Sequence, residues 1–402
     1  MAVGNNPLTD LHAVPGVRLG TTCAGFKHKN RDDLLVIELA DGNQTAAVFT
    51  RNAFCAAPVE VARAHLAGHA TSFLLINSGN ANCGLGQQGL DVAKQSCVEL
   101  ARLAGGASEA VLPFSTGVIA EPMSLDLFKE ALPKAFAGLQ ADNWSAAARA
   151  IMTTDTYPKG ASRQFVLDGE TITMTGIAKG SGMIHPDMAT MLAFICTDAS
   201  IAQADLQACL KRAVDVSFNR ITVDGDTSTN DACVLAASCQ KGSLLDGEQL
   251  EAFYTELEIL CQELAQAVIR DGEGATRLMT VKVEQAASDA EADEVAFTVA
   301  HSPLVKTALF AGDPNWGRIL AAVGRAKVEN FSIAGINIFL NDVQIVRNGA
   351  RDAGYTEEQG QAIMQQDEVI VRIELARGEH SSTVWTCDLS YDYVRINAEY
   401  RS

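Results

Sequence analysis

The chain has 402 residues, of which 48% are hydrophobic and 20% charged, and its formal net charge is −18. This length favours more than one domain, because single hydrophobic cores stop growing at about 250–300 residues, and the apolar content excludes global disorder. Because the chain is strongly negative and has no run of Lys and Arg, it repels phosphate groups. Nucleic acid and anionic membranes are therefore not expected partners. The longest central apolar run, 188–196, has about half of the roughly 20 residues that a membrane helix needs, and residues 1–10 lack the pattern of a secretory signal.

The ten cysteines are scattered, and none forms a C-x-x-C pair. This pattern favours free, buried thiols in a reducing cytoplasm over a zinc or iron–sulfur site. His65 and His69 lack the Glu that a zinc protease carries between them, and the run 224–231 lacks the glycine and glutamate positions of a calcium loop. That run remains a candidate hydrogen-bonding loop. We therefore expect no metal site.

Hydrophobic periodicity predicts strands and helices that alternate irregularly through the first half of the chain. Strands are expected at 34–40, 46–50 and 73–76, and a helix at 90–104. Between the last strand and this helix lies a glycine-rich run, 79–86. It matches neither a Walker loop nor a G-x-G-x-x-G fingerprint, so both a loop wall and an anion cradle remain open.

The second half opens with two predicted helices. Ser200 is a candidate cap for a helix that carries an apolar stripe to residue 213. Asp246 and Gln249 resemble a capping box before a longer helix that stops at 271–272. The acidic run 286–294 shows no periodicity and is interpreted as a loop or a boundary. Strands are then expected at 295–300, 336–340, 369–375 and 383–389. The mixture predicts an α/β protein in the α+β sense, divided near residue 285.

The central segment 179–194 runs from a Gly/Ser turn through Pro186 to Ala189, Thr190 and an apolar strand. Taken alone, it favours a loop that enters a buried strand. Seven blocks in order, however, resemble the ornithine acetyltransferase (glutamate N-acetyltransferase, ArgJ) family of arginine biosynthesis over nearly the whole chain. These blocks are 77–82, 115–119, 152–156, 179–192, 222–231, 311–318 and 396–400.

The resemblance implies a fold and a processing event. The implied fold is an αββα layered sandwich of the self-processing N-terminal-nucleophile-like type over residues 1–285, followed by a smaller α/β domain over 286–402. Self-cleavage between Ala189 and Thr190 would give fragments 1–189 and 190–402. A threonine hydroxyl is a weak nucleophile until a base accepts its proton. The α-amino group freed by cleavage, with a typical pKa of about 7.7–8.0, can serve as that base.

The resemblance also implies the site residues. Thr116 and Gly117 correspond to an oxyanion hole, which stabilises the negative oxygen of a tetrahedral intermediate. Lys179 suits an amino-acid carboxylate, and Glu273 suits an ammonium group such as that of ornithine; a solvated surface and a helix-end turn are the alternatives for these two. The implied substrate contacts are Thr153, Lys179, Thr190, Glu273, Asn397 and Ser402.

The implied activity is ping-pong transfer of acetyl from N-acetylornithine to glutamate through Thr190. No metal or bound cofactor is implied. Some members of the family also use acetyl-CoA as a co-substrate and others do not, a choice that the sequence leaves open. The implied assembly is a cytoplasmic heterotetramer with two copies of each fragment. The alternatives are a self-processing amidase or aminopeptidase of the same fold and a non-catalytic binding protein with an inert Thr190.

Overall fold

The computed structural model describes residues 3–4, 8, 10–27, 29–185 and 191–399. By its internal contacts the chain divides into two compact units. The larger comprises Pro7–Asn219 and Asp226–Val268, and the smaller comprises Met1–Asn6, Arg220–Gly225 and Ile269–Ser402. Each unit is described by itself. Within the described residues, every helix is too short or too polar to cross a lipid bilayer.

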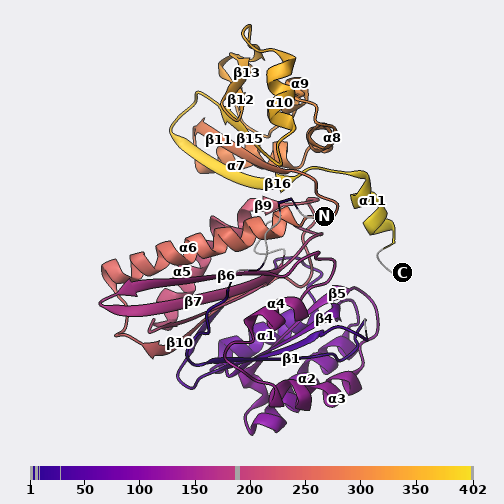
Figure 1. Ribbon diagram of the computed structural model, residues 1–402, viewed down its shortest axis with the longest axis vertical. Helices are drawn as coiled ribbons and strands as arrows, with labels where there is room; N and C mark the ends of the chain where they lie inside the picture. Colours follow the sequence, from indigo (N-terminus) through magenta and orange to yellow (C-terminus); the bar gives the residue numbers. More distant parts are fainter. Residues whose placement is uncertain (1–2, 5–7, 9, 28, 186–190, 400–402) are drawn as a thin grey trace. The chain divides into compact units, whose positions relative to one another are not determined.

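The larger unit contains two mixed sheets (Figure 1). One has the strand order β1–β2–β4–β5, with bounds Val17–Thr22, Leu34–Leu39, Phe73–Asn80 and Val111–Val118. The other has the order β3–β10–β8–β7–β6, with bounds Gln44–Phe49, Ala232–Lys241, Leu192–Ala199, Glu170–Lys179 and Lys159–Leu167. The neighbours β4 and β5 are parallel, as are β8 and β10. Parallel neighbours end at the same edge of a sheet, so each sheet brings two strand ends together there.

The two sheets pack face to face through a shared hydrophobic core. Side chains at alternate strand positions, such as Leu35 and Ile37 of β2, meet side chains of β8 and β10 from the other sheet. The rings of Phe114 and Phe194 approach edge to face across this core, with centroids 5.1 Å apart. Trp144, fully buried in α4 (Trp144–Ala150), joins the same cluster. Because period-2 alternation places every second residue in this layer, the core fixes which side chains face each other.

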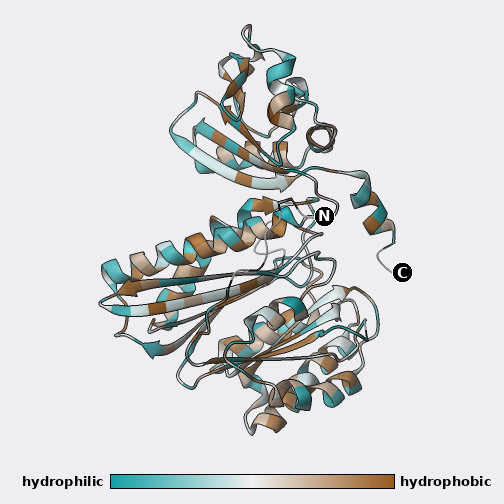
Figure 2. Cartoon of the chain, in the orientation of Figure 1, coloured by the Kyte–Doolittle hydropathy of each residue, from teal (hydrophilic) through white to brown (hydrophobic). Residues whose placement is uncertain are grey.

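Helices cover the outer face of each sheet. The outward residues of the four-stranded sheet, including Val36 and Leu75, pack against α1, α2 and α3. On the other sheet, Leu260 and Leu264 of α6 lie against β7 at Gly176, and α5 lies over β3 and β10. Along α6 hydrophilic and hydrophobic residues alternate, as expected of a helix with one face on a sheet (Figure 2). The bounds are Ala57–Gly68 for α1, Gln87–Ala104 for α2, Leu125–Ala137 for α3, Gln203–Asp215 for α5 and Gly247–Arg270 for α6, with short 3₁₀ turns at Ser108–Ala110 and Phe218–Arg220. The predicted mixed class and its layered order are confirmed.

The smaller unit is a seven-stranded sheet packed against helices. The strand order is β14–β13–β12–β15–β11–β16–β9, with bounds Ala350–Arg351, Val343–Arg347, Asn337–Leu340, Glu368–Glu374, Leu278–Ala286, His380–Cys387 and Ile221–Thr222. The helices are α7 (Asp289–Ala300), α8 (Pro303–Ala311), α9 (Trp316–Gly324), α10 (Glu357–Met364) and α11 (Tyr391–Ala398), with a 3₁₀ turn at Ile333–Gly335. In β15, Val369 and Val371 are buried in the core whereas Ile370 is exposed, so one face of the sheet carries the core.

Two predictions in this unit are wrong. The run 286–294, predicted as a loop, and the run 295–300, predicted as a strand, together contain α7. Ser288 caps this helix by accepting a hydrogen bond from the backbone N–H of Glu291, and acidic residues fill its first turn. The buried positions Ala292, Val295, Ala296 and Val299 follow helical spacing. The predicted domain boundary at residue 285 lies inside β11; as a limit of independent folding it stays a prediction.

The shared core yields a stability prediction. Leu74 of β4 is 0% exposed in the inter-sheet core, whereas Leu244 is 61% exposed. We expect Leu74→Ala to lower the free energy of unfolding by about 3–5 kcal/mol, because it removes apolar contacts and leaves a cavity. The matched variant Leu244→Ala should change it by less than about 0.5 kcal/mol. Chemical denaturation followed by tryptophan fluorescence measures both, and equal effects would contradict the assignment of the core.

Candidate active site

The ends of β4 and β5 approach each other unusually closely at two glycines. Gly79 and Gly117 are register partners, and the pairing becomes irregular at Asn80. Gly117 has φ +132°, and a Cβ built on it would lie 2.3 Å from the carbonyl carbon of Gly79 and 2.6 Å from the nitrogen of Asn80. Only glycine fits this position without moving the backbone. Near the end of β5, Gly117 of the sequence Ser115-Thr116-Gly117 therefore has a backbone conformation that no other residue type allows.

Lys179, the last residue of β7, reaches across from the other sheet. Its Nζ donates a hydrogen bond to Oγ1 of Thr116, at 3.0 Å. An ammonium group only donates hydrogen bonds, so the Thr116 hydroxyl must accept this one through its oxygen. Its own O–H hydrogen is then directed to another acceptor, and the neighbouring positive charge makes it a stronger donor.

A buried carboxylate lies behind these groups. Asp155 and Lys159 form an ion pair of 2.6 Å in which both side chains are 0% exposed. The same Oδ1 of Asp155 accepts the backbone N–H of Gly180 at 2.8 Å, and Oδ2 accepts that of Thr153 at 2.9 Å. Burial alone would raise the pKa of Asp155, but the charges of Lys159 and Lys179 outweigh burial and hold this pKa below its usual range. Asp155 is therefore ionised.

A second buried carboxyl group behaves in the opposite way. Asp231 directly precedes β10, where the backbone N–H of Ala232 donates to the carbonyl oxygen of Met191 at 3.0 Å. Within the described part of the chain, Oδ2 of Asp231 has no hydrogen-bond partner. Burial raises the pKa of Asp231 well above its ordinary value, although a hydrogen bond with Ser228 and the charge of Lys179 oppose this. Burial therefore favours the protonated form of Asp231 more than it is favoured in an exposed aspartate.

The loop before β10 ties the two sheets together. Nδ2 of Asn230 donates to the carbonyl oxygens of Ala81 at 2.7 Å and of Ser115 at 2.9 Å. The latter residue lies two positions before Gly117, so Asn230 holds the strand end that carries Thr116 and Gly117. This loop belongs to the oxygen-rich run that the sequence predicted to form hydrogen bonds, and that prediction is confirmed.

A separate polar pair lies in the smaller unit. Glu273 is buried in the turn after α6, and its Oε2 accepts a hydrogen bond of 2.8 Å from Nδ2 of Asn397 in α11. The turn and the helix are in close contact, because a Cβ on Gly274 would lie 2.5 Å from the nitrogen of Tyr393. The hydroxyl of Ser390 also donates to the carbonyl oxygen of Gly274 at 2.6 Å. A carboxylate has about four acceptor positions, so Glu273 is chemically suited to a cation.

The predicted site residues thus form two groups, each within its own unit. Those in the larger unit are Thr116, Gly117, Thr153 and Lys179, joined through Asp155 and the Lys179–Thr116 contact. Those in the smaller unit are Glu273 and Asn397. Ala189, Thr190 and Ser402 lie outside the described residues.

Sequence reasoning missed Asp155, Lys159, Asn230 and Asp231. One signal was available for the first two, because they are the only charged residues in the stretch 150–162. Opposite charges four residues apart in an otherwise uncharged, partly apolar segment suggest a buried ion pair. Asn230 and Asp231 lie in the run predicted as a hydrogen-bonding loop, but their particular partners could not be predicted because they come from distant strands.

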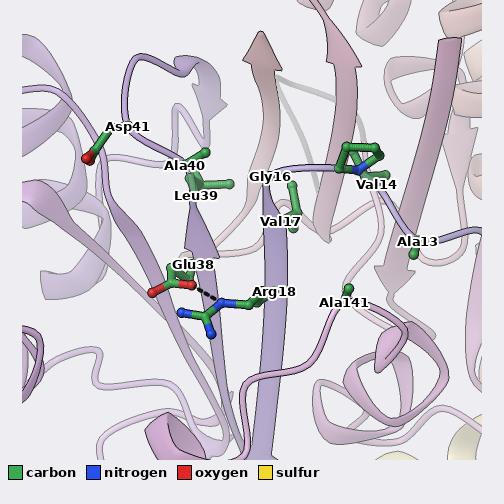
Figure 3. A pocket seen from close by; sticks show the side chains of 11 residues that line it. Ala13, Val14, Gly16, Val17, Arg18, Glu38, Leu39, Ala40, Asp41 and Ala141 are labelled. Carbon is green, nitrogen blue, oxygen red and sulfur yellow. Dashed lines mark hydrogen bonds and ion pairs between the residues drawn. The ribbon is translucent and has the colours of Figure 1, made fainter. Parts of the chain in front are cut away.

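One pocket in the described residues lies away from this group. It has a volume of about 630 Å³, and two of its three charged residues, Arg18 and Glu38, pair with each other (Figure 3). Glu38 is the register partner of Phe73, which in turn pairs with Val111. Val111 precedes Thr116 by five residues, or roughly 17 Å at 3.3 Å per residue. Among the described residues, no cluster of His, Cys, Asp or Glu is arranged to hold a metal ion.

Two sheets packed between helices, with a glycine-dependent strand end and buried charges at one edge, define a layered α/β protein with an enzyme-like site. The chain belongs to the ArgJ family, whose model matches residues 18–402. It is 57% identical to the arginine biosynthesis bifunctional protein ArgJ of Methylococcus capsulatus over 98% of both chains. The solved structure of the Bacillus halodurans protein of that name is 41% identical, with a TM-score of 0.49, over 51% of this chain and 97% of that one. Ornithine acetyltransferase of Mycobacterium tuberculosis, solved with ornithine, is 27% identical, with a TM-score of 0.39, over 44% of this chain and 94% of that one.

The close approach at Gly117 yields a second prediction. Gly117→Ala should lower the free energy of unfolding by about 2 kcal/mol more than Gly169→Ala, because the new Cβ overlaps the backbone of β4. Gly169 is a matched control, since its φ is also positive, at +81°, yet a Cβ there meets nothing within 4 Å. Chemical denaturation of both variants measures the difference. Equal losses would show that backbone strain alone, rather than the contact with Gly79, makes glycine necessary.

The buried Asp231 carboxyl yields a third prediction. Its raised pKa means that the folded chain keeps this proton at pH values where the unfolded chain, with an Asp pKa of about 3.9, has released it. The stability from this group is therefore fully present below about pH 4 and is lost as pH rises toward the folded-state pKa. Asp231→Asn cannot titrate, so its stability relative to the wild type should rise between pH 4.5 and pH 8. Denaturation at several pH values tests this, and parallel curves would contradict it.

Proposed function

We propose that the chain is an ornithine acetyltransferase that moves acetyl from N-acetylornithine to glutamate through an ester on Thr190. As a member of the ArgJ family, it is an acyltransferase of arginine biosynthesis. The contact of Lys179 with Thr116 is the observation that supports this mechanism best, because it makes the Thr116 hydroxyl a polarised donor beside the backbone N–H of Gly117.

The first proposed reaction is self-cleavage. The hydroxyl oxygen of Thr190 attacks the carbonyl carbon of Ala189, and the resulting oxyanion accepts hydrogen bonds from Thr116 and Gly117. The C–N bond then breaks, and the amine of Thr190 leaves with the proton given up by the hydroxyl. Hydrolysis of the ester frees the carboxylate of Ala189 and restores the hydroxyl of Thr190. Chain connectivity supports this role, since Thr190 is two residues before Leu192, the register partner of Lys179.

The second proposed reaction is acetyl transfer. The free amine of Thr190 accepts the hydroxyl proton while the oxygen attacks the acetyl carbonyl of N-acetylornithine. The same oxyanion donors serve this intermediate; ornithine leaves, and the α-amino group of glutamate then attacks the acetyl ester. We assign the ammonium group of ornithine to Glu273, supported by Asn397, and the substrate carboxylate to Lys179. Thr153 and Ser402 complete the proposed substrate contacts.

We further propose that both fragments stay together as a heterotetramer with two copies of each. The order of the five-stranded sheet supports a permanent association. Strand β8 would belong to fragment 190–402 and β7 to fragment 1–189, yet they are hydrogen-bonded neighbours. Separating the fragments would therefore break the sheet. We place the enzyme in the cytoplasm, consistent with free buried thiols such as Cys196 and Cys387.

A fourth prediction tests processing and chemistry together. Mature protein should run as two bands on a denaturing gel, whereas Thr190→Ala should give one uncut chain. The cleaved protein should exchange labelled ornithine into N-acetylornithine without glutamate, because the acetyl-enzyme forms in a separate half-reaction. The variant should show at least a 1,000-fold slower exchange, since it lacks the nucleophile. An intact band in mature protein would contradict self-cleavage.

The same assay separates the alternatives. An amidase would release acetate from N-acetylornithine faster than it acetylates glutamate, and a binding protein would do neither. Replacing N-acetylornithine with acetyl-CoA as the donor measures whether the chain also synthesises N-acetylglutamate directly. Gly169→Ala, which lies in a β-hairpin turn, serves as a processed control that should retain the wild-type exchange rate.

A further inference from the structure

The Asp155–Lys159 pair is the most deeply buried ion pair in the described residues and is not among the predicted site residues. Its two side chains are fully buried, and three donors converge on the Asp155 carboxylate. Two of these donors are backbone N–H groups, from Thr153 and Gly180. Thr153 is itself a proposed substrate contact, and Gly180 directly follows Lys179. A single carboxylate therefore joins the segment that contains Thr153 to the end of β7.

Lys159 is itself held from several sides. Besides Asp155, its Nζ donates to the carbonyl oxygen of Tyr157 at 3.4 Å and lies 4.9 Å from the centre of the Tyr157 ring. The Tyr157 hydroxyl in turn donates to the carbonyl oxygen of Ala267 in α6, at 2.8 Å. The ammonium thus has a fixed position against one side of Asp155.

The balance of charge explains what this arrangement does for Lys179. Asp155 attracts both lysines, and in a buried site such attraction is strong. Because Lys159 is already paired with Asp155 at 2.6 Å, the Lys179 ammonium lies with Thr116 instead. The Lys179 ammonium therefore places positive charge directly beside the proposed oxyanion donors.

We propose that the Asp155–Lys159 pair is a positioning element for the oxyanion hole, acting through Lys179 on Thr116. Asp155 fixes the backbone at Gly180, which orients the end of β7, and Lys159 neutralises Asp155 so that Lys179 engages the threonine hydroxyl. This inference rests on the proposed function. It assigns the pair its main role in the transition state, because the contact of Lys179 with Thr116 leads to an oxyanion donor, although Thr153 and Lys179 are also proposed substrate contacts.

Asp155→Asn tests the proposal. It keeps the shape of the side chain but removes the charge and replaces one acceptor oxygen with an NH₂ group. We expect kcat for acetyl transfer, expressed per cleaved chain, to fall about 10- to 100-fold, since a small displacement of a catalytic group costs that much. The KM for N-acetylornithine should change by a smaller factor than kcat, because the interaction lost is made mainly in the transition state. A kcat within threefold of wild type would overturn the proposal.

A matched variant separates positioning from general stability. Asp198→Asn changes another buried carboxylate, which accepts the backbone N–H of Thr173 at 2.7 Å and pairs with Lys241 at 3.3 Å. Asp198 lies at the opposite end of β8 from Leu192. The Asp198→Asn substitution should therefore lower the stability of the fold and leave kcat unchanged. If Asp198→Asn lowers kcat as much as Asp155→Asn, the effect is one of folding and the proposal is wrong.

A double-mutant cycle with Thr116→Val tests the route of the effect. If Asp155 acts through Lys179 on Thr116, Asp155→Asn should lower kcat less than about threefold once the hydroxyl is gone. An undiminished loss in the Thr116→Val background would overturn the proposal.

A second variant applies if Asp155→Asn does not fold. Asp155→Asn combined with Lys159→Met removes both charges, a change that buried ion pairs often tolerate, and the same measurements apply. Ornithine exchange by the wild type is measured first, so its absence contradicts the proposed function, whereas normal kcat in the variants contradicts only this inference.

Discussion

The face-to-face packing of two mixed sheets is the constraint on which the candidate site depends. Lys179 ends a strand of one sheet and Thr116 lies near the end of a strand of the other, so their contact exists only while the two layers keep their spacing and register. That spacing comes from apolar side chains such as Phe114, two residues before Thr116 on β5, and Phe194 on β8. The hydrophobic core thus determines the geometry of the polar edge.

The polar edge also carries a cost that the surrounding structure must offset. Removing two lysines and a carboxylate from water is unfavourable unless each gains strong partners. Asp155 receives Lys159 and two backbone N–H groups, so its charge is well compensated. Asp231 has no such set of donors, and burial raises its pKa. The pKa values of these two buried aspartates therefore shift in opposite directions because the charges of Lys159 and Lys179 act on Asp155, not because of their distance from solvent.

Much of the fold was predictable from the sequence because strand and helix periods are local. The strands at 34–40 and 73–76 and the helix after Asp246 all follow from spacing. The error at 286–300 has a physical cause: α7 begins with small and acidic residues, and its apolar stripe becomes visible only when Ala292 is counted with Val295 and Val299. The site was harder. Glu273 and Asn397 were indicated only by resemblance, and the surroundings of Asp231 depend on strands distant in sequence.

The position of β8 between β7 and β10 has a consequence for how a processed molecule would fold. In the uncut chain, these strands meet by closing loops within one polypeptide, at a modest entropic cost that grows slowly with loop length. After a cut at 189/190, the same strand pairing joins two separate polypeptides. Complete unfolding would then become dissociation, with a midpoint that depends on protein concentration. Refolding of the cut protein from denaturant would be a bimolecular reaction. The precursor therefore gains the one-chain pathway only if it folds before it is cut.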